Sequence, residues 1–344
     1  MKKIFFAALA AVALTACVAD VVTEEPTYAI DFVSNTQGTV KSTVVTAANF
    51  GSFKVFAFNG ENVIMDNMLV SQGKDENEQF NGEWSYSPKK YWPAEGTVDF
   101  YGVYANEPDA IKFNYSATAE YGLKFKINMP TVKNDDGTEF IYDENSVVDA
   151  AAIPDVVYAT AFEKDKDGGK VPMTFYHAMA QVDFKIKNAT TPANNIVVVA
   201  GDVYVKNMQC CGTYTANISG HSWGFTQGTN HYLFKTNGVS ITNPEGSPFT
   251  TEGILNDVCM VLPQAATVEF GLNCTIKQLN DNGVGSVDLF NGEKTATVSV
   301  DWNEGYKYTY TFALYDENLT DNEINFTAEV EEFKAAPTTP DKEM

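Results

Sequence analysis

Hydrophobic and polar residues alternate along most of the chain with a period of two, which is the spacing of one face of a β-strand. Turn-forming clusters such as "NGEN", "KNDDGTE" and "LNDNG" separate the alternating segments, and few windows show the spacing of a helix. The pattern predicts an all-β protein with strands at intervals suited to β-sandwiches. The segments that alternate or are rich in β-branched and aromatic residues are 53–58, 98–104, 123–129, 182–187, 267–276, 295–302 and 308–314.

A polar, proline-containing segment, "KNATTPANN" at 187–195, follows one of the strongest strand patterns and predicts a domain boundary. Each side of it has the length of an ordinary folding unit. The predicted organisation is a signal peptide at 1–16, an acidic tether at 17–26, an N-terminal β-sandwich domain at 27–190, a C-terminal β-sandwich domain at 191–334 and a polar tail at 335–344.

The N-terminus, "MKKIFFAALAAVALTAC", combines two lysines, an apolar run and small residues before a cysteine. This is the pattern of a secretory signal and is short for a membrane span. Its "LTAC" ending resembles a bacterial lipobox, which implies cleavage after Ala16 and attachment of acyl chains such as palmitate to Cys17. Acyl chains would anchor the protein to a membrane. The alternative is a plain signal peptide cleaved near Ala16, which would leave Cys17 as an ordinary thiol.

The formal net charge is −22, and all 23 basic residues are lysines. A surface of this sign repels a phosphate backbone, so nucleic acid is not an expected partner. The sequence contains no arginine, the usual residue for bidentate contacts to phosphate or carboxylate. The acidity is interpreted as a source of solubility.

The densest aromatic stretch is "GEWSYSPKKYWPAEGTVDFYGVY" at 82–104. It has two interpretations: a core rich in aromatic residues, or a platform on which sugar rings stack. Since no cluster of polar side chains accompanies the rings, the core interpretation is favoured. Within this stretch, Gly102 predicts either a bulge or a close approach of the backbone. The candidate platform residues are Trp84, Tyr91, Trp92 and Trp223, with Phe225 beside the last.

Few residues are candidates for catalysis or metal binding. His177 in "FYHAM" is the best isolated candidate for a general base, but no motif places a nucleophile beside it. His221 and His231 flank a predicted loop, and two histidines ten residues apart are a weak metal signal. The segment "EKDKDGGK" begins like a calcium loop but has Thr174 at the twelfth position, so a charged turn is favoured. The prediction is therefore no catalytic residue, no metal and no cofactor.

Four further cysteines are Cys210, Cys211, Cys259 and Cys274. An exported chain meets oxidising conditions, so one or two disulfides are expected, with free buried thiols as the alternative. The pairing stays open, because adjacent cysteines in a strand point to opposite faces.

Several motifs occur in an order that resembles a known family. "WSYSPKKYWPAEGTVDFYGVY" is followed by "VPMTFYHAMAQVDFKIKN", whose residues from His177 to Phe184 stand where that family carries H-A-L-A-x-V-x-F. "CMVLPQ", "EGYKYTYTF" and "INFTAEVEEF" match more loosely in the second half. With the lipobox, the chain resembles the fimbrillin-like lipoproteins of the Bacteroidia, the major and minor fimbrial subunits, over most of its length.

The resemblance implies two transthyretin-like β-sandwich domains in tandem and a role in type V pili. In such pili, lipidated precursors reach the outer surface and a trypsin-like protease removes an N-terminal strand. The vacated groove then accepts a donor strand from a neighbouring subunit, which is β-augmentation. Other pilin subunits, the outer membrane and a host or bacterial surface ligand are the implied partners.

Two features of this chain depart from that pattern. Processing in the family follows an arginine, whereas here Lys41 lies where the cut would release 28–35; the alternative is an exposed loop lysine in a strand that stays attached. The C-terminal segment "KAAPTTPDKEM" has two prolines and few apolar side chains, so it is a poor donor strand. The chain therefore suits an acceptor at a tip or accessory position, or a standing lipoprotein.

The sequence thus predicts a surface-exposed outer-membrane lipoprotein that acts as a fimbrial subunit or pilus-associated adhesin, without catalysis. The alternative function is a carbohydrate-binding outer-membrane lipoprotein that uses the aromatic platform residues.

Overall fold

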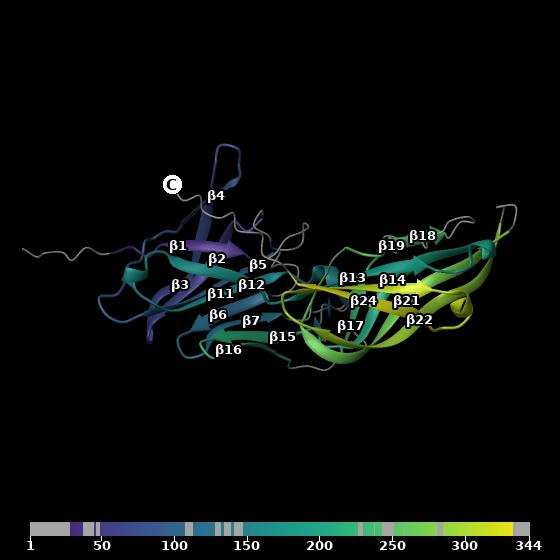
Figure 1. The fold of residues 1–344 in the computed structure, drawn as a ribbon. Coiled ribbons are helices and arrows are strands. Elements are labelled where there is room, and N and C mark those ends of the chain that lie inside the picture. The colour runs from purple at the N-terminus through teal and green to yellow at the C-terminus, as the bar shows by residue number, and fades with distance from the viewer. Residues whose placement is uncertain are drawn as a thin grey trace, which may run out of the picture.

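The computed structural model describes residues 28–36, 45, 49–106, 113–127, 132–133, 139–140, 147–225, 230–236, 238–242, 251–257, 259–280 and 285–332. Within these ranges the chain is all-β, as predicted, and its helical elements are 3₁₀ turns of three residues each. No helix among the described residues is long and apolar enough to cross a membrane. The sheets form a sandwich-like fold in an elongated molecule (Figure 1). The 3₁₀ turns are η1 (Ala150–Ala152), η2 (Lys166–Gly168), η3 (Pro192–Asn194) and η4 (Asp316–Asn318).

One half of the molecule contains a seven-stranded sheet with the order β1-β12-β11-β5-β2-β3-β4. The pairing of β1 with β12 is parallel, and the other pairings are antiparallel. One face of this sheet encloses a core that includes Phe53, Phe100 and Phe175. The strands are β1 (Phe32–Thr36), β2 (Ser52–Asn59), β3 (Asn62–Lys74), β4 (Phe80–Ser85), β5 (Val98–Ala105), β11 (Val156–Lys164) and β12 (Val171–His177).

A four-stranded sheet with the order β16-β15-β7-β6 packs on the other face of the seven-stranded sheet. Tyr158 of the larger sheet contacts Tyr214 of the smaller one, with ring centroids 5.0 Å apart. Tyr214 in turn stacks on Phe125 at 4.7 Å. The strands are β6 (Phe113–Thr118), β7 (Gly122–Ile127), β15 (Gly212–Asn217) and β16 (Gly220–Gly224).

Two further sheets face each other in the other half of the molecule. Phe184 of one sheet meets Phe234 and Phe270 of the other, with ring centroids 4.9 and 5.3 Å apart. The first sheet contains β13 (Ala180–Asn188), β19 (Thr251–Ile254), β20 (Cys259–Val261), β23 (Tyr306–Leu314) and β24 (Asn325–Glu332). The second contains β10 (Val147–Asp149), β14 (Ile196–Met208), β17 (Asn230–Phe234), β18 (Val239–Thr242), β21 (Gln264–Leu279) and β22 (Ser286–Trp302). A separate short pair is formed by β8 (Val132–Lys133) and β9 (Glu139–Phe140).

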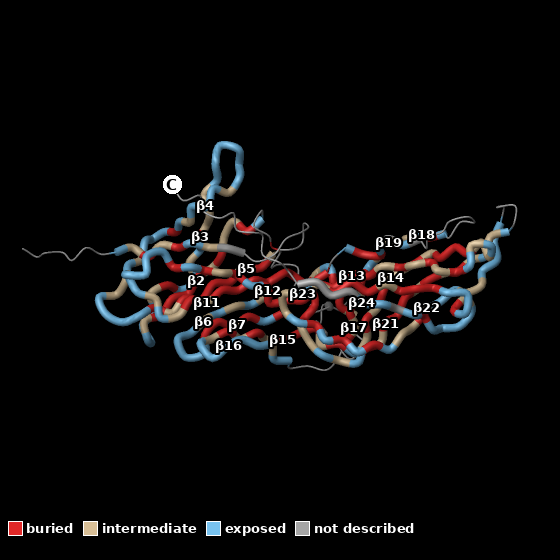
Figure 2. Tube along the Cα trace, viewed as in Figure 1, coloured by how far each residue is buried: buried red, intermediate tan, exposed pale blue. Residues whose placement is uncertain are grey.

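Strands from the two sides of the predicted boundary at residue 190 pair with each other. β13 lies before the boundary and pairs with β23 in parallel. β15 lies after it and pairs with β7. A single cluster of buried residues runs from Phe56 and Tyr101 in one half to Phe270 and Phe312 in the other (Figure 2). The domain limits and the transthyretin-like arrangement stay predictions.

Gly102 marks a close approach of the backbone to neighbouring side chains, one of its two predicted roles. The register at Gly102 is regular, with Ala159 of β11 opposite on one side and Val55 of β2 on the other. A Cβ added there would lie 2.8 Å from Phe175 Cζ and 2.9 Å from Met173 Cε. Glycine at position 102 of β5 thus leaves room for the side chains of Phe175 and Met173 from β12.

Candidate functional site: the groove of the N-terminal strand

Residues 28–36 lie between β12 and the segment that follows β4. On one side, β1 pairs in parallel with β12, with Phe32 opposite Val171. On the other side, the residues before β1 pair with the segment that follows β4: Ile30 N donates to Lys90 O at 2.9 Å, and Trp92 N donates to Tyr28 O at 3.0 Å. The N-terminal segment therefore joins the two ends of the sheet around its core.

The side chains of this segment alternate between the core and solvent. Ile30 and Phe32 are 0% and 2% exposed, whereas Val33 is 44% exposed. The Phe32 ring meets Phe53 and Phe100 edge-on, each with a centroid distance of 5.9 Å. Edge-to-face pairs of this kind stabilise a core beyond the area that they bury. The strand is therefore held by apolar pockets as well as by main-chain hydrogen bonds.

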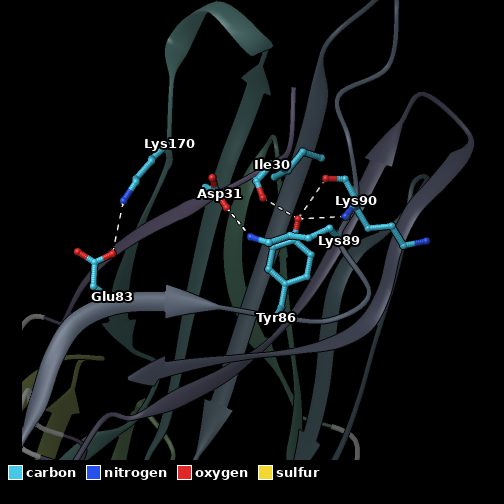
Figure 3. A network of polar contacts seen from close by, with 7 residues as sticks. All are labelled: Ile30, Asp31, Glu83, Tyr86, Lys89, Lys90 and Lys170. Atoms are coloured by element: carbon cyan, nitrogen blue, oxygen red, sulfur yellow. Dashed lines mark hydrogen bonds and ion pairs between the residues drawn. The ribbon is translucent and has the colours of Figure 1, made fainter. Parts of the chain in front are cut away.

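A polar network anchors the same segment from the 86–92 side (Figure 3). The Tyr86 hydroxyl donates to Ile30 O at 2.6 Å and accepts from Lys90 N at 3.3 Å. Burial raises the pKa of the Tyr86 hydroxyl, so it stays a protonated donor at neutral pH. Lys89 Nζ lies 2.7 Å from Asp31 Oδ1, and this hydrogen bond raises the pKa of the Lys89 ammonium. Both partners of this ion pair are more than two-fifths exposed, so it contributes little stability.

The arrangement is a strand-shaped groove that residues 28–36 fill. Without them, the β12 main chain would lose its parallel partner, and the rings of Phe53, Tyr86 and Phe100 would lose the Phe32 ring. Unpaired strand edges above apolar pockets bind extended peptides, because main-chain groups supply affinity and alternate side chains supply specificity. The groove can thus hold one extended strand.

Comparison with known proteins shows the family to which the chain belongs. A family model described as fimbrillin-like matches residues 36–332. The chain belongs to the fimbrillin-like family. Residues 1–17 of this fimbrillin-like chain also match a model described as a prokaryotic membrane lipoprotein lipid attachment site, and that match ends at Cys17. No curated protein matches the sequence.

Two solved structures share the fold of the fimbrillin-like chain. A fimbrial protein from Bacteroides vulgatus superposes with a TM-score of 0.57 at 13% identity, covering 88% of this chain and 99% of that one. A protein from Bacteroides uniformis assigned to cell adhesion superposes with a TM-score of 0.51 at 19% identity, covering 89% and 98%. At these identities the likeness is one of fold.

The predicted processing residues lie outside the described residues. Ala16, Cys17 and Lys41 are all in this category. The described positions that flank Lys41 are the end of β1 on one side and Val45 on the other. Val45 is fully buried in the same core as Phe32.

The candidate platform residues are distributed over two cores. Trp84 packs on Phe53 at 5.1 Å, and Trp92 packs on Phe100 at 5.7 Å, both in the core of the groove. Trp223 contacts Phe125 at 5.6 Å, and its Nε1 donates to Ala178 O at 2.8 Å. Tyr91 is 48% exposed. The three tryptophans thus contact core rings, and Trp223 belongs to a different cluster from the other two.

The histidines lie apart from one another. His177 is buried beside Asp155, with Nδ1 2.9 Å from Asp155 Oδ2. His221 Nδ1 lies 2.6 Å from Glu304 Oε1, while His231 is on β17 in another sheet. Among the described residues, no group of three or more His, Cys, Asp or Glu side chains is arranged to hold a metal ion.

All four described cysteines are buried, and Cys210, Cys259 and Cys274 are free thiols. Burial raises the pKa of each thiol, to about 12 for Cys259 and about 11 for Cys274. Such thiols are protonated and unreactive at neutral pH. The free buried thiol is therefore the state of Cys210, Cys259 and Cys274 in the structure.

Two buried hydrogen-bonding residues were not identified from the sequence. The partner of Tyr86 has no local signal, because the carbonyl that its hydroxyl binds is 56 positions away. No sequence pattern marks Asp155 as buried, since its spacing does not distinguish it from the other acidic residues among the 45 of the chain.

Proposed function

We propose that this fimbrillin-like chain is a cell-surface fimbrial subunit that accepts a donor strand in the groove now filled by residues 28–36. The observation that carries the proposal is the position of this segment, which pairs with β12 through residues 31–36 and with the segment 90–92 through residues 28–30, and which buries Ile30 and Phe32. A strand bound in this way can be replaced by another of similar pattern. Other fimbrial subunits are then its partners, and its activity is assembly rather than catalysis.

Removal of the strand requires a cut in the chain after Thr36. Lys41 is the proposed cleavage position, since it lies between the strand and the buried Val45. A lysine-cleaving protease would release the segment in the groove and leave a chain that begins at Ser42. Before this cut, the attached strand occupies the groove at a high effective concentration, which prevents premature assembly.

We further propose attachment to the outer membrane through lipid on Cys17, with palmitate among the acyl chains. The family membership and the lipid attachment match support a surface lipoprotein. The tail at 335–344 has two prolines, so the chain is proposed as an acceptor, at a tip or accessory position. Release by the cut at Lys41 would free the subunit from its own anchor.

A reversible lock on the strand tests the proposal. Ala29 and Tyr91 face each other in an antiparallel bridge flanked by two hydrogen bonds, which is the non-hydrogen-bonded type of pair. Its short Cα–Cα distance, about 4.5 Å, suits a disulfide. We expect the oxidised double variant Ala29→Cys/Tyr91→Cys to remain outside fimbriae, and reduction to restore incorporation.

The two single cysteine variants are the matched controls and are expected to assemble in either redox state. Incorporation is measured as the amount of the chain in purified fimbriae. Equal incorporation of the oxidised and reduced double variant would rule out exchange through this groove.

A further inference from the structure

A buried carboxylate holds the chain just beyond the proposed cleavage position. Asp155 lies immediately before β11 and is 0% exposed. Its Oδ2 accepts a hydrogen bond from Val45 N at 2.8 Å. Val45 is also 0% exposed, and only three residues separate it from Lys41. The segment after the cut thus has its own attachment point, separate from the groove.

His177 completes this attachment. Its Nδ1 lies 3.0 Å from Asp155 Oδ1 and 2.9 Å from Oδ2, and its side chain is 2% exposed. The main chain around the pair is fixed as well, because Asn106 N donates to Asp155 O and Ala178 N donates to Val156 O. His177 and the surrounding main chain therefore hold the Asp155 carboxylate in the orientation in which it accepts from Val45 N.

Residues 28–36 and the segment at Val45, on either side of Lys41, differ in the free energy that their release would require. Residues 28–36 are held by main-chain pairing, by apolar contacts and by the exposed Lys89–Asp31 ion pair. In the described part of the chain, their departure leaves no buried charge without a donor, since their ion pair is with the exposed Lys89. Departure of Val45 would remove one donor from a fully buried carboxylate, which is strongly unfavourable. A cut between the segments therefore frees the first and retains the second.

We infer that Asp155, oriented by His177, is a clasp that retains the new N-terminal segment while the strand at 28–36 leaves. The inference rests on the proposed processing of the chain. It names Asp155 and His177 as positioning residues for strand exchange.

Retention of this segment matters to the groove because it leads to Phe50. The Phe50 ring contacts Phe175 at 4.7 Å and stacks on Phe53 at 6.1 Å. Phe53 is one of the rings that meet Phe32. The clasp thus keeps part of the groove floor in place for an incoming strand.

Hydrogen exchange on the intact, full mature chain tests the clasp without any cleavage. In Asp155→Ala we expect the Val45 amide to exchange about tenfold faster or more, because it loses a bond to a charged acceptor. Asp155→Asn keeps an acceptor oxygen and is expected to show a smaller change. For His177, Asn can reproduce the Nδ1 donor and Ala cannot, so His177→Ala is expected to speed Val45 exchange more than His177→Asn.

Asp99→Ala is the matched control, since Asp99 Oδ1 also accepts a main-chain N–H, from Glu163 at 2.8 Å, in the same sheet but away from Val45. It should leave Val45 exchange unchanged. Exchange in β14 and β21 should stay the same in every variant. Unchanged Val45 exchange in Asp155→Ala and His177→Ala, or an equal rise in β14 and β21, would overturn the clasp.

A second measurement separates the clasp from the processing itself. The wild type and Asp155→Ala are treated with a lysine-specific protease and then briefly with chymotrypsin, and their N-termini are determined by mass. We expect a chain that begins at Ser42 in the wild type and at Gly51 in the variant, because Phe50 becomes accessible. Equal trimming of both proteins would contradict the clasp. If neither protein is cut after Lys41, the proposed processing fails and the exchange data still decide on the clasp.

Discussion

At the scale of single residues, Tyr86 connects the N-terminal segment to the rest of the fold. Its hydroxyl donates to Ile30 O at 2.6 Å, and its ring meets Phe32 at 5.7 Å. We expect Tyr86→Phe to keep the ring contact and to weaken docking of residues 28–30 by roughly 1–2 kcal/mol, because a buried carbonyl loses its donor. Hydrogen exchange of the 28–36 amides measures this. Tyr91→Phe is the control, as the Tyr91 ring is half exposed; equal exchange in the two variants would contradict the role given to Tyr86.

A second residue-scale prediction concerns Asp316, whose carboxylate joins two loops. Thr191 N donates to both of its oxygens at 3.1 Å, and Asn194 Nδ2 donates at 2.9 Å. The hydrogen bond from the Thr191 side chain is the main cause that lowers the pKa of Asp316 below its usual 3.8. Because its pKa is lower in the folded state, the ionised carboxylate stabilises the fold at pH values above the unfolded-state pKa. This stability is lost as the pH falls through the folded-state pKa.

Asp316→Asn is therefore expected to reduce the free energy of unfolding at pH 7, by no more than about 1 kcal/mol because the site is exposed. The difference from the wild type should shrink as the pH falls below 3.8. Urea unfolding at pH 7 and pH 3 measures it. A difference that grows on acidification would contradict this assignment.

At the scale of elements, β1 depends on one aromatic side chain. We expect Phe32→Ala to cost roughly 3–5 kcal/mol of docking energy, since it leaves a cavity among three rings. The exposed neighbour Val33 provides the control, with an expected cost within about 0.5 kcal/mol for Val33→Ala. Protease sensitivity of the N-terminal segment compares the two. Equal sensitivity would show that Phe32 does not hold the strand.

The elements also show what the sequence can predict. The segments at 53–58, 182–187 and 308–314 are strands in the structure, because runs rich in β-branched and aromatic residues between turn signals favour a strand, and most of their residues are buried. The parallel partners of β1 and β13 were not predicted, since pairing between distant strands leaves no local pattern. The groove followed from the family resemblance, whereas the Val45–Asp155 contact joins residues 110 positions apart and had no signal.

At the scale of the whole molecule, each half contains strands from both sides of residue 190, and one cluster of buried residues spans the two halves. We therefore expect a single cooperative unfolding transition. Trp84, Trp92 and Trp223 report on the half that contains the groove, and Trp302 is buried in the other half. In Trp302→Phe and in Trp84→Phe/Trp92→Phe/Trp223→Phe alike, the midpoint of unfolding measured by fluorescence should equal the midpoint measured by circular dichroism. Two separated transitions would favour independent domains.

We propose that the N-terminal strand leaves the groove when the subunit assembles. The most direct test is the N-terminus and intact mass of the chain purified from native fimbriae. We expect a chain that begins at Ser42, without lipid and without residues 28–36. A chain that begins at acylated Cys17 within assembled fimbriae would contradict the claim, because the groove would still hold its own strand.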